Sequence, residues 1–475
     1  MVQNSMANDF RVSLDTIPTE FRPLEIRTAS TYIIYNHFIL TLVKENKQGE
    51  MTAHLAESWD VDELSQNYSF VIDDRFKWSN GEKILAEDVV KHFRFAISKN
   101  TTVHSDFGSI AKVYAKGKSI HFNLKESNTR FLHEISRPEA GILKPDLIEK
   151  ENFLSVSSGP YFLDQMNKEQ IILKRNMYFP SVVEDYPSQV SFVPRLWKQL
   201  SSDLSSGTVD LALAPADVTL KGHNSLLSQS KVKVFEPYAA FSFFLTINPL
   251  SKKFEKKLEL RKFIQGIIAP GTIEFDNLSA SWKTSRQLYL EDSSGRADSS
   301  WLNKFWTTTR AFKKPAKGTP KKLRILSTDK MELLPQIRDV FAKHGISLVV
   351  VPYKDRKELI ALRADPSSYD IAIRSNEFSG GDVLDNLFVT FTDAHRIIPI
   401  EPSSQIPNFI ERAKKETSLR NRYELYEKIS KEVLEKAYIT PLAYNKIMFY
   451  HQPNLDLSEW TRLYPELTVW KIKTK

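Results

Sequence analysis

The chain has 475 residues, no cysteine, and 66 lysines and arginines against 58 aspartates and glutamates, a formal net charge of +8. At roughly 150 residues per domain, this length predicts about three domains. Hydrophobic residues at 41%, aromatic residues at 11% and charged residues at 26% exclude a disordered or fibrous protein. The lack of cysteine excludes a disulfide scaffold, a cysteine-bound zinc site, an iron–sulfur cluster and a thiol nucleophile.

The N-terminal sequence, MVQNSMANDFRVSL, contains no basic segment followed by an apolar run, so no signal peptide is predicted. A transmembrane helix needs about 18 or more consecutive apolar residues. No later stretch of this chain approaches that length. A chain that begins in this way is compatible with a cytoplasmic protein. It is equally compatible with a mature secreted protein written without its leader.

In the first half of the chain, Tyr68–Ile72 and Ser119–Leu124 alternate apolar and polar residues. This period of two predicts half-buried strands. Between them, Glu87 and Asp88 mark the start of a predicted helix, because acidic side chains interact favourably with a helix N-terminus. Its buried stripe is expected to contain Val89, Val90, Phe93 and Ile97.

The most basic stretch of the chain, residues 313–324, contains two prolines and one glycine. Such a composition is typical of an exposed connector. Because the densest positive charge lies there and not beside aromatic side chains, we expect no nucleic-acid partner.

Strand and helix patterns alternate after this connector. Apolar runs at Leu323–Ser327, Ile346–Val351 and Tyr369–Ile373 predict three strands, the second of them covered on both faces. Residues 333–345 and Asp355–Ala364 have the apolar spacing of helices. The resulting βαβαβ order predicts a parallel sheet with right-handed crossovers.

The third strand of this unit, which spans residues 323–374, leads directly into a polar segment. That segment reads Arg-Ser-Asn-Glu-Phe-Ser-Gly-Gly-Asp over residues 374–382. Ligands of open parallel sheets bind beyond the carboxyl ends of the strands. We therefore predict that residues 374–382 form part of a ligand-binding site.

Near the C-terminus, Arg422–Ala437 is predicted to form a long amphipathic helix. Leu425, Ile429 and Val433 recur on one face of it. Ile439–Tyr444, which follows, has the apolar character of a strand.

No catalytic motif is complete in this sequence. There is no phosphate-binding glycine loop, and no histidine pair has zinc-ligand spacing. Ser109–Lys112 and Ser327–Lys330 match the S-x-x-K pattern of β-lactamases without its companion motifs. We expect no enzymatic activity, no cofactor and no metal site. A Ser-Lys hydrolase is the alternative that rests on these two matches.

Several segments, in order along residues 51–445, resemble the peptide/nickel class of bacterial extracytoplasmic solute-binding proteins, family 5. Its N-terminal signature has the form "LAESW … vkWSDGepltAEDVvfSf". The matching segments here are Leu55–Trp59 (LAESW), Phe76–Glu82 (FKWSNGE), Ala86–Phe93 (AEDVVKHF), Gly159–Phe162 (GPYF), Leu173–Asn176 (LKRN), Ser206–Asp210 (SGTVD), Phe243–Asn248 (FFLTIN) and Ile439–Leu442 (ITPL).

The resemblance implies an α/β protein with the two-lobed periplasmic-binding-protein (flytrap) fold, an extra inserted domain, and mixed sheets flanked by helices. Domain I would comprise residues 1–38, 155–237 and 440–475, domain II the insert 39–154, and domain III residues 238–439. A ligand would bind between two closing lobes, and the closed form would be presented to the membrane permease of an ABC importer. A periplasmic or extracytoplasmic monomer is expected. The alternative is a solute-sensing regulatory module with the same fold.

The ligand loop departs from the family pattern. Peptide-binding members carry "GWxxD", in which the Trp lines the cleft and the Asp pairs with the ligand's α-ammonium. Here Asn376 stands in place of the Trp and Ser379 in place of the Asp. A neutral hydroxyl cannot supply the charge-assisted bond of a carboxylate, although Glu377, Asp382 or Asp385 could do so from nearby. The ligand is thus an oligopeptide or another small polar solute.

The predicted ligand-binding residues come from this loop and from the strand that leads into domain III. They are Arg374, Asn376, Glu377, Phe378, Ser379, Asp382, Phe241, Phe243 and Asn248. Arg374 could pair with a ligand carboxylate. Trp282, Trp301 and Trp306 either pack on the lobe surface or form a remodelled wall of the cleft.

Overall fold

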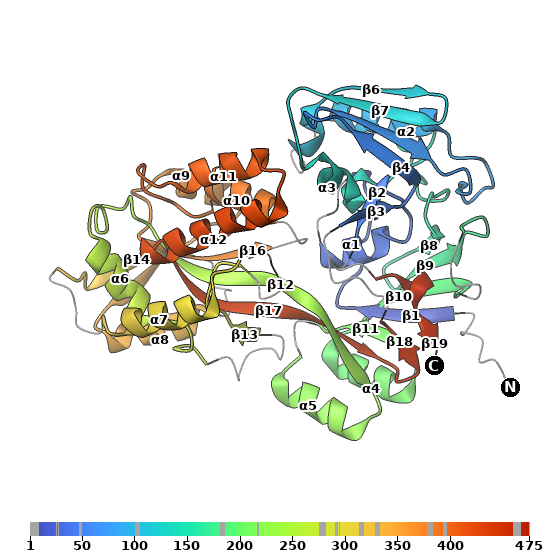
Figure 1. The fold of residues 1–475 in the computed structure, drawn as a ribbon. Helices are drawn as coiled ribbons and strands as arrows, with labels where there is room; N and C mark the ends of the chain where they lie inside the picture. The colour runs from blue at the N-terminus through green and yellow to red at the C-terminus, as the bar shows by residue number, and fades with distance from the viewer. Residues whose placement is uncertain are drawn as a thin grey trace. The chain divides into compact units, whose positions relative to one another are not determined.

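The structure is a computed structural model of the chain. It describes residues 9–24, 26, 28–46, 50–99, 105–180, 186–215, 218–274, 282–289, 293, 295–312, 318–327, 333–377, 383–392, 397–458 and 467–474. The chain divides into two compact units (Figure 1). Unit 1 comprises Met1–Pro237 and Ile447–Lys475, and unit 2 comprises Tyr238–Lys446. The chain enters unit 2 within strand β12 (Lys233–Ile247) and leaves it within β17 (Ile439–His451).

Unit 1 is built from strands and five helices among its described residues. Its strands are β1 (Asp9–Leu14), β2 (Val43–Glu45), β3 (Met51–Ala53), β4 (Ala56–Val61), β5 (Asn67–Ile72), β6 (Ile110–Lys116), β7 (Ser119–Leu124), β8 (Tyr161–Met166), β9 (Ile171–Arg175), β10 (Gln189–Pro194), β11 (Leu211–Leu213), β18 (Leu455–Asp456) and β19 (Lys473–Thr474). Its helices are α1 (Ala29–Tyr35), α2 (Ala86–Lys99), α3 (Phe131–Ser136), α4 (Trp197–Ser206) and α5 (Leu220–Gln229).

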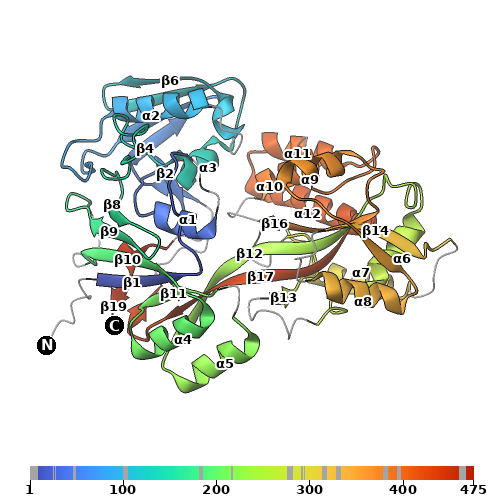
Figure 2. The same cartoon turned by 180° about the vertical axis from the view of Figure 1, so that it is seen from behind.

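Two sheets organise unit 1. A mixed sheet has the order β17-β11-β1-β10-β9-β8, in which β1 is parallel to β10 and β11. An antiparallel sheet has the order β4-β5-β7-β6, and α2 lies along it (Figures 1 and 2). The predicted alternation in β5 and β7 is confirmed, because every second residue of both strands is buried.

Each sheet of unit 1 has its own hydrophobic core. The mixed sheet packs on α1 around Val12, Ile33 and Tyr161. The antiparallel sheet packs on α2 around Phe70, whereas Trp78 lies fully buried in the same core. The burial of Trp78 and Tyr161 shows that two residues of the family-like motifs build the fold. The three-domain division stays a prediction.

Gly159, in the Gly-Pro-Tyr motif, packs directly against main chain. A Cβ atom there would lie 2.5 Å from the carbonyl carbon of Phe38 and 2.6 Å from the nitrogen of Ile39. The amide of Gly159 also donates to the Phe38 carbonyl at 3.0 Å. Any side chain must therefore push the two segments apart.

Gly159→Ala is expected to lower the free energy of unfolding by about 1–3 kcal/mol, since backbone cannot yield as a flexible side chain does. Urea unfolding measures the change. Gly108→Ala is the matched control, because a Cβ at Gly108 meets nothing within 4 Å. Equal stability of the two variants would contradict the packing argument.

Unit 2 is an α/β unit. Besides β12 and β17, its strands are β13 (Trp282–Thr284), β14 (Lys322–Leu326), β15 (Ser347–Val351) and β16 (Ile371–Glu377). Its helices are α6 (Leu258–Ile267), α7 (Ser299–Arg310), α8 (Leu334–Lys343), α9 (Arg356–Ala364), α10 (Leu384–Phe391), α11 (Ile406–Lys415) and α12 (Leu419–Glu435). The strand order is β15-β14-β16-β12-β17, and β13 pairs with β17.

The predicted βαβαβ unit is present as β14-α8-β15-α9-β16. Both β15 and β16 are parallel to β14, which confirms the parallel sheet. Gly345 follows α8 with a positive φ of 72°, a conformation that favours glycine. Helix α9 begins one residue after its predicted start, because the side chain of Asp355 caps it by accepting from the Glu358 amide at 2.8 Å.

One prediction about this sheet is wrong. β15 was expected to be covered on both faces, but it is the edge strand, and Ser347 and Val349 are exposed. Its β-branched run reflects strand propensity and partial burial, not a central position.

The two faces of β16 pack against different helices (Figures 1 and 2). Ile371 and Ile373 lie in a core with residues of α6 and α8. Ala372, on the opposite face, lies in a cluster that contacts Leu359 and Leu362 of α9. No described helix in either unit has the length and apolar character needed to cross a membrane.

Candidate ligand-binding site

The structure pairs two parts of the predicted site that lie far apart in the sequence. β12 and β16 are antiparallel neighbours, and their register places Phe241 opposite Glu377 and Phe243 opposite Ser375. The strand leading into unit 2 therefore runs beside the start of the predicted ligand loop.

Phe241 and Phe243 belong to a small aromatic group. Both side chains are half-buried, with ring centroids 6.5 Å apart. Phe243 also packs on Trp282 of β13, with centroids 4.5 Å apart and planes inclined at 43°. The amide of Phe241 donates to Oδ1 of Asn445 at 2.9 Å. These contacts give the part of β12 around Phe241 and Phe243 an apolar, partly accessible face.

Arg374 lies on the other face of the same strand pair. It is opposite Phe244 in the register, and side chains one residue apart on a strand point to opposite faces, so Arg374 and Phe243 do not share a face. The Arg374 side chain is buried, with its guanidinium carbon 5.8 Å from the centre of the Tyr369 ring. Burial lowers the pKa of Arg374 from its ordinary value.

The guanidinium of Arg374 has unused donors. Among the described residues, neither its Nε nor its Nη2 has a hydrogen-bond partner. The guanidinium has a hydrogen bond with the neutral side chain of Tyr369 but no counter-charge among the described residues. A buried cation without a counter-charge is costly, so this side chain is the feature of the site that most clearly calls for a further group.

Asn248 is fully buried and its amide is engaged within unit 2. Its Nδ2 donates to the carbonyls of Pro366 at 3.1 Å and Tyr369 at 3.0 Å, and its Oδ1 accepts from the Leu250 amide at 3.0 Å. These bonds join the end of β12 to the segment that precedes β16. They give Asn248 a positioning role, while a ligand contact of Asn248 stays a prediction.

The remaining predicted residues lie mostly outside the described part of the chain. The backbone of Asn376 and Glu377 belongs to β16, but their side chains are not among those described. Phe378, Ser379 and Asp382 lie outside the described residues. Their roles stay predictions.

A charged cluster at the start of β16 was not predicted from the sequence. The fully buried carboxylate of Asp370 accepts from Ser251 Oγ at 2.7 Å, Lys253 Nζ at 2.8 Å and the Arg324 amide at 2.8 Å. Arg324 Nη2 adds a bond of 3.0 Å. Burial alone would raise the pKa of Asp370, but the hydrogen bonds from Arg324 and Lys253 prevail and lower it to about 2.

For Trp282, Trp301 and Trp306, the sequence predicts either packing on the lobe surface or a place in the wall of the cleft. Trp306 is buried in a core of unit 2, and its Nε1 donates to the Arg286 carbonyl at 2.8 Å. Trp301 stacks on Phe305 with centroids 5.1 Å apart. Both therefore pack within unit 2, whereas Trp282 lies beside Phe243.

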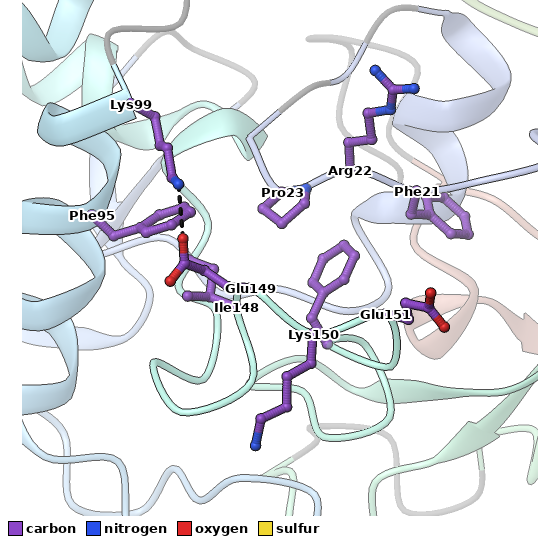
Figure 3. A pocket seen from close by; sticks show the side chains of 10 residues that line it. Phe21, Arg22, Pro23, Phe95, Lys99, Ile148, Glu149, Lys150 and Glu151 are labelled. Atoms are coloured by element: carbon purple, nitrogen blue, oxygen red, sulfur yellow. Dashed lines mark hydrogen bonds and ion pairs between the residues drawn. The ribbon is translucent and has the colours of Figure 1, made fainter.

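Unit 1 contains a separate cavity of about 420 Å³ (Figure 3). Its lining combines aromatic and charged side chains: Phe21, Arg22, Pro23, Phe95, Lys99, Ile148, Glu149, Lys150, Glu151 and Phe153. Lys99 Nζ pairs with Glu149 Oε1 at 2.7 Å and lies 4.9 Å from the Phe95 ring centre. None of the predicted site residues lines it. Three segments distant in sequence form it, so no local signal could have predicted it.

The described residues contain no group of His, Asp and Glu side chains arranged to hold a metal ion. The described strand pair therefore offers apolar contact on one face, at Phe241 and Phe243, and hydrogen-bond donation on the other face, at Arg374.

Comparison with known proteins finds similarity to one kind of protein. Residues 50–266 match the model of bacterial extracellular solute-binding proteins, family 5 Middle. A probable D,D-dipeptide-binding periplasmic protein, DdpA, of Escherichia coli K12 is 25% identical over 229 residues, 45% of this chain and 43% of that protein. The nickel-binding periplasmic protein of the same organism is 26% identical over 150 residues, 29% of this chain and 28% of that protein. The matches thus span less than half of these curated relatives.

Solved structures of other proteins can be superimposed on nearly the whole chain. NikA from Brucella suis, in complex with Fe(III)-EDTA, has a TM-score of 0.79 at 16% identity and covers 98% of this chain and 100% of its own. DppA from Helicobacter pylori, in complex with the peptide STSA, has a TM-score of 0.74 at 17% identity, with 98% of each chain covered. These likenesses confirm the predicted fold class. The chain is thus similar to family 5 of the bacterial extracellular solute-binding proteins over residues 50–266, and its fold is similar to theirs over nearly its whole length.

Proposed function

We propose that the protein is the extracytoplasmic substrate-binding component of a bacterial ABC importer and captures a small polar solute. The observation that carries this proposal is the family 5 match at residues 50–266 together with a family-type fold over 98% of the chain. Binding proteins of this kind change conformation around a ligand and need no catalytic group.

The class of solute is a separate question. The relatives named above are described with ligands as different as a peptide, nickel and Fe(III)-EDTA. This chain carries Asn376 and Ser379 where peptide-binding members carry the Trp and Asp of their ligand loop. We therefore propose a small polar solute without restricting it to peptides.

Residues of β12 and β16 and of the segment after β16 form the proposed ligand surface. The aromatic face at Phe241 and Phe243, Arg374, and the segment from Asn376 to Asp382 are the proposed contact residues. A membrane permease of the importer is the proposed partner, the protein is proposed to act as a monomer without nucleic acid, and it is proposed to have no catalytic activity.

A solute that binds the folded protein is expected to raise its melting temperature. At about 100 times its Kd, such a solute adds about 2.7 kcal/mol to the free energy of unfolding, because it binds the folded state alone. Differential scanning fluorimetry against peptides, amino acids, organic acids and metal chelates measures the shift. The stabilising solute should be recovered unchanged after incubation. Chemical conversion of that solute would contradict the non-catalytic proposal.

A further inference from the structure

Arg374 differs from two other buried arginines of unit 2. Arg261 is 1% exposed and donates to Glu401 Oε1 at 3.0 Å and to two backbone carbonyls. Arg422 is 4% exposed and donates twice to the Glu416 carbonyl. Arg374 is 3% exposed, yet its Nε and Nη2 have no partner among the described residues. Burial of guanidinium groups is thus compensated in the two comparable cases.

The two unused nitrogens of Arg374 lie on one edge of the planar guanidinium. Nε–H and one N–H of Nη2 point in the same direction, with the spacing of two oxygens of a carboxylate or phosphate. One oxyanion can therefore accept both hydrogen bonds side-on. No single neutral acceptor atom satisfies this edge equally well and also balances the charge.

The described neighbours of Arg374 do not provide that anion. Tyr369, whose ring centre is 5.8 Å from the guanidinium carbon, has a side-chain hydrogen bond with Arg374 but carries no negative charge. The carboxylate of Asp370, in the same segment, already forms ion pairs with Lys253 and Arg324. The buried carboxylate and the buried cation of this strand are therefore not partners.

We infer that the Nε–Nη2 edge of Arg374 binds an oxyanion, a carboxylate or phosphate group, of the transported solute. This inference rests on the proposed function and specifies the solute class. It reverses the polarity implied for peptide-binding members, in which a carboxylate of the protein holds an ammonium of the ligand. Here the protein supplies the cation and the solute supplies the anion.

The stability of the ligand-free protein separates a solute anion from an internal one. Arg374→Met keeps the length of the side chain and removes the charge. If the edge is vacant without solute, the ligand-free variant is expected to melt at the wild-type temperature or higher, since an uncompensated buried charge is lost. Arg422→Met is the matched control and should melt lower, because the donors of Arg422 are in use.

A lower melting temperature for Arg374→Met, or its failure to fold, overturns the inference. Either result indicates that a carboxylate of the chain itself forms an ion pair with Arg374. Glu377→Gln and Asp385→Asn then identify that carboxylate, since each should reproduce the loss if it is the partner. Arg374→Lys, which keeps the charge but not the fork, provides a folded variant for the binding measurements.

Binding is measured by calorimetry with wild type and both Arg374 variants. The probes are sodium acetate and sodium phosphate at constant ionic strength, followed by each solute that stabilises the wild type. The bound oxyanion solute is expected to lose at least about 100-fold in affinity in Arg374→Met and about 10-fold in Arg374→Lys. A response to acetate identifies a carboxylate, and a response to phosphate identifies a phosphate group.

Two results separate the failure of this inference from that of the proposed function. A solute that lacks any oxyanion, or one that binds Arg374→Met as tightly as wild type, overturns the inference and leaves the solute-binding function intact. Absence of binding by any solute to the wild type overturns both.

Discussion

The wild-type protein is expected to lose about 5 kcal/mol of unfolding free energy between pH 7 and pH 4.5 through two buried histidines. Burial lowers the pKa of His37 and of His92 to about 3. In the unfolded chain, each imidazole takes up a proton near its ordinary pKa of about 6.5. Stability is therefore fully present above pH 6.5 and falls by about 1.4 kcal/mol per pH unit per histidine as the pH drops towards 3.

The surroundings of the two histidines explain why their pKa values are lowered in the folded state. The Nδ1 of His37 donates to the Ile33 carbonyl at 2.9 Å, while its ring is enclosed by the rings of Tyr161, Phe192 and Trp470. The Nδ1 of His92 accepts from the Leu143 amide at 3.3 Å. Neither Nε2 has a hydrogen-bond partner among the described residues. A second proton on His37 would therefore lie on Nε2 in an apolar core, and a second proton on His92 would lie on Nδ1, against the Leu143 amide that donates to this atom.

Urea unfolding at several pH values tests this prediction. His37→Gln and His92→Gln, compared with the wild type, should each reduce the pH slope below 6.5 by about 1.4 kcal/mol per unit. His121→Gln is the control, because His121 is half-buried on the surface of the antiparallel sheet, stacked on Tyr114. An unchanged slope in both buried variants would contradict the argument.

Asp370→Asn is expected to lower the free energy of unfolding by about 3 kcal/mol, at the lower end of the range for a broken buried ion pair. The amide keeps the shape of the carboxylate but leaves Lys253 and Arg324 without their counter-charge. The side chains of these cations are 35% and 38% exposed, and water therefore compensates part of the loss.

The control for Asp370 lies five residues earlier in the chain. The exposed carboxylate of Asp365 accepts from the amide and Oγ of Ser367, and Asp365→Asn should change stability much less. Chemical denaturation at pH 7 compares the two variants. Because the pKa of Asp370 is lowered to about 2, its contribution to stability is fully present above pH 3.8 and is lost as the pH falls towards 2. This range lies mostly below the pH range in which His37 and His92 reduce stability. Wild-type stability of Asp370→Asn would contradict the cluster's role.

Local periodicity was enough to predict the βαβαβ unit. The stripe from Leu334 to Phe341 and the positive φ at Gly345 are properties of neighbouring residues, which a single sequence displays. The position of β15 at the sheet edge depends on which strands pair, and its composition carries no such information. Likewise, β17 extends to His451, well beyond the predicted Tyr444, because it pairs with β11 near its end.

The candidate site was predicted in part for the same reason. Topology and the family resemblance both indicated the end of β16, and Phe243 lies beside it. That Arg374 and Phe243 occupy opposite faces follows only from the strand register. The bonds of Asn248 to the segment before β16 and the cluster around Asp370 join residues distant in sequence, so neither had a local signature.

The most direct test of solute binding is native mass spectrometry of protein freshly purified from the cells that produce it. We expect a population that carries one additional small-molecule mass, which is released on denaturation and identifies the solute. A spectrum that contains the bare chain alone, together with no melting-temperature rise for any solute tested, would contradict it.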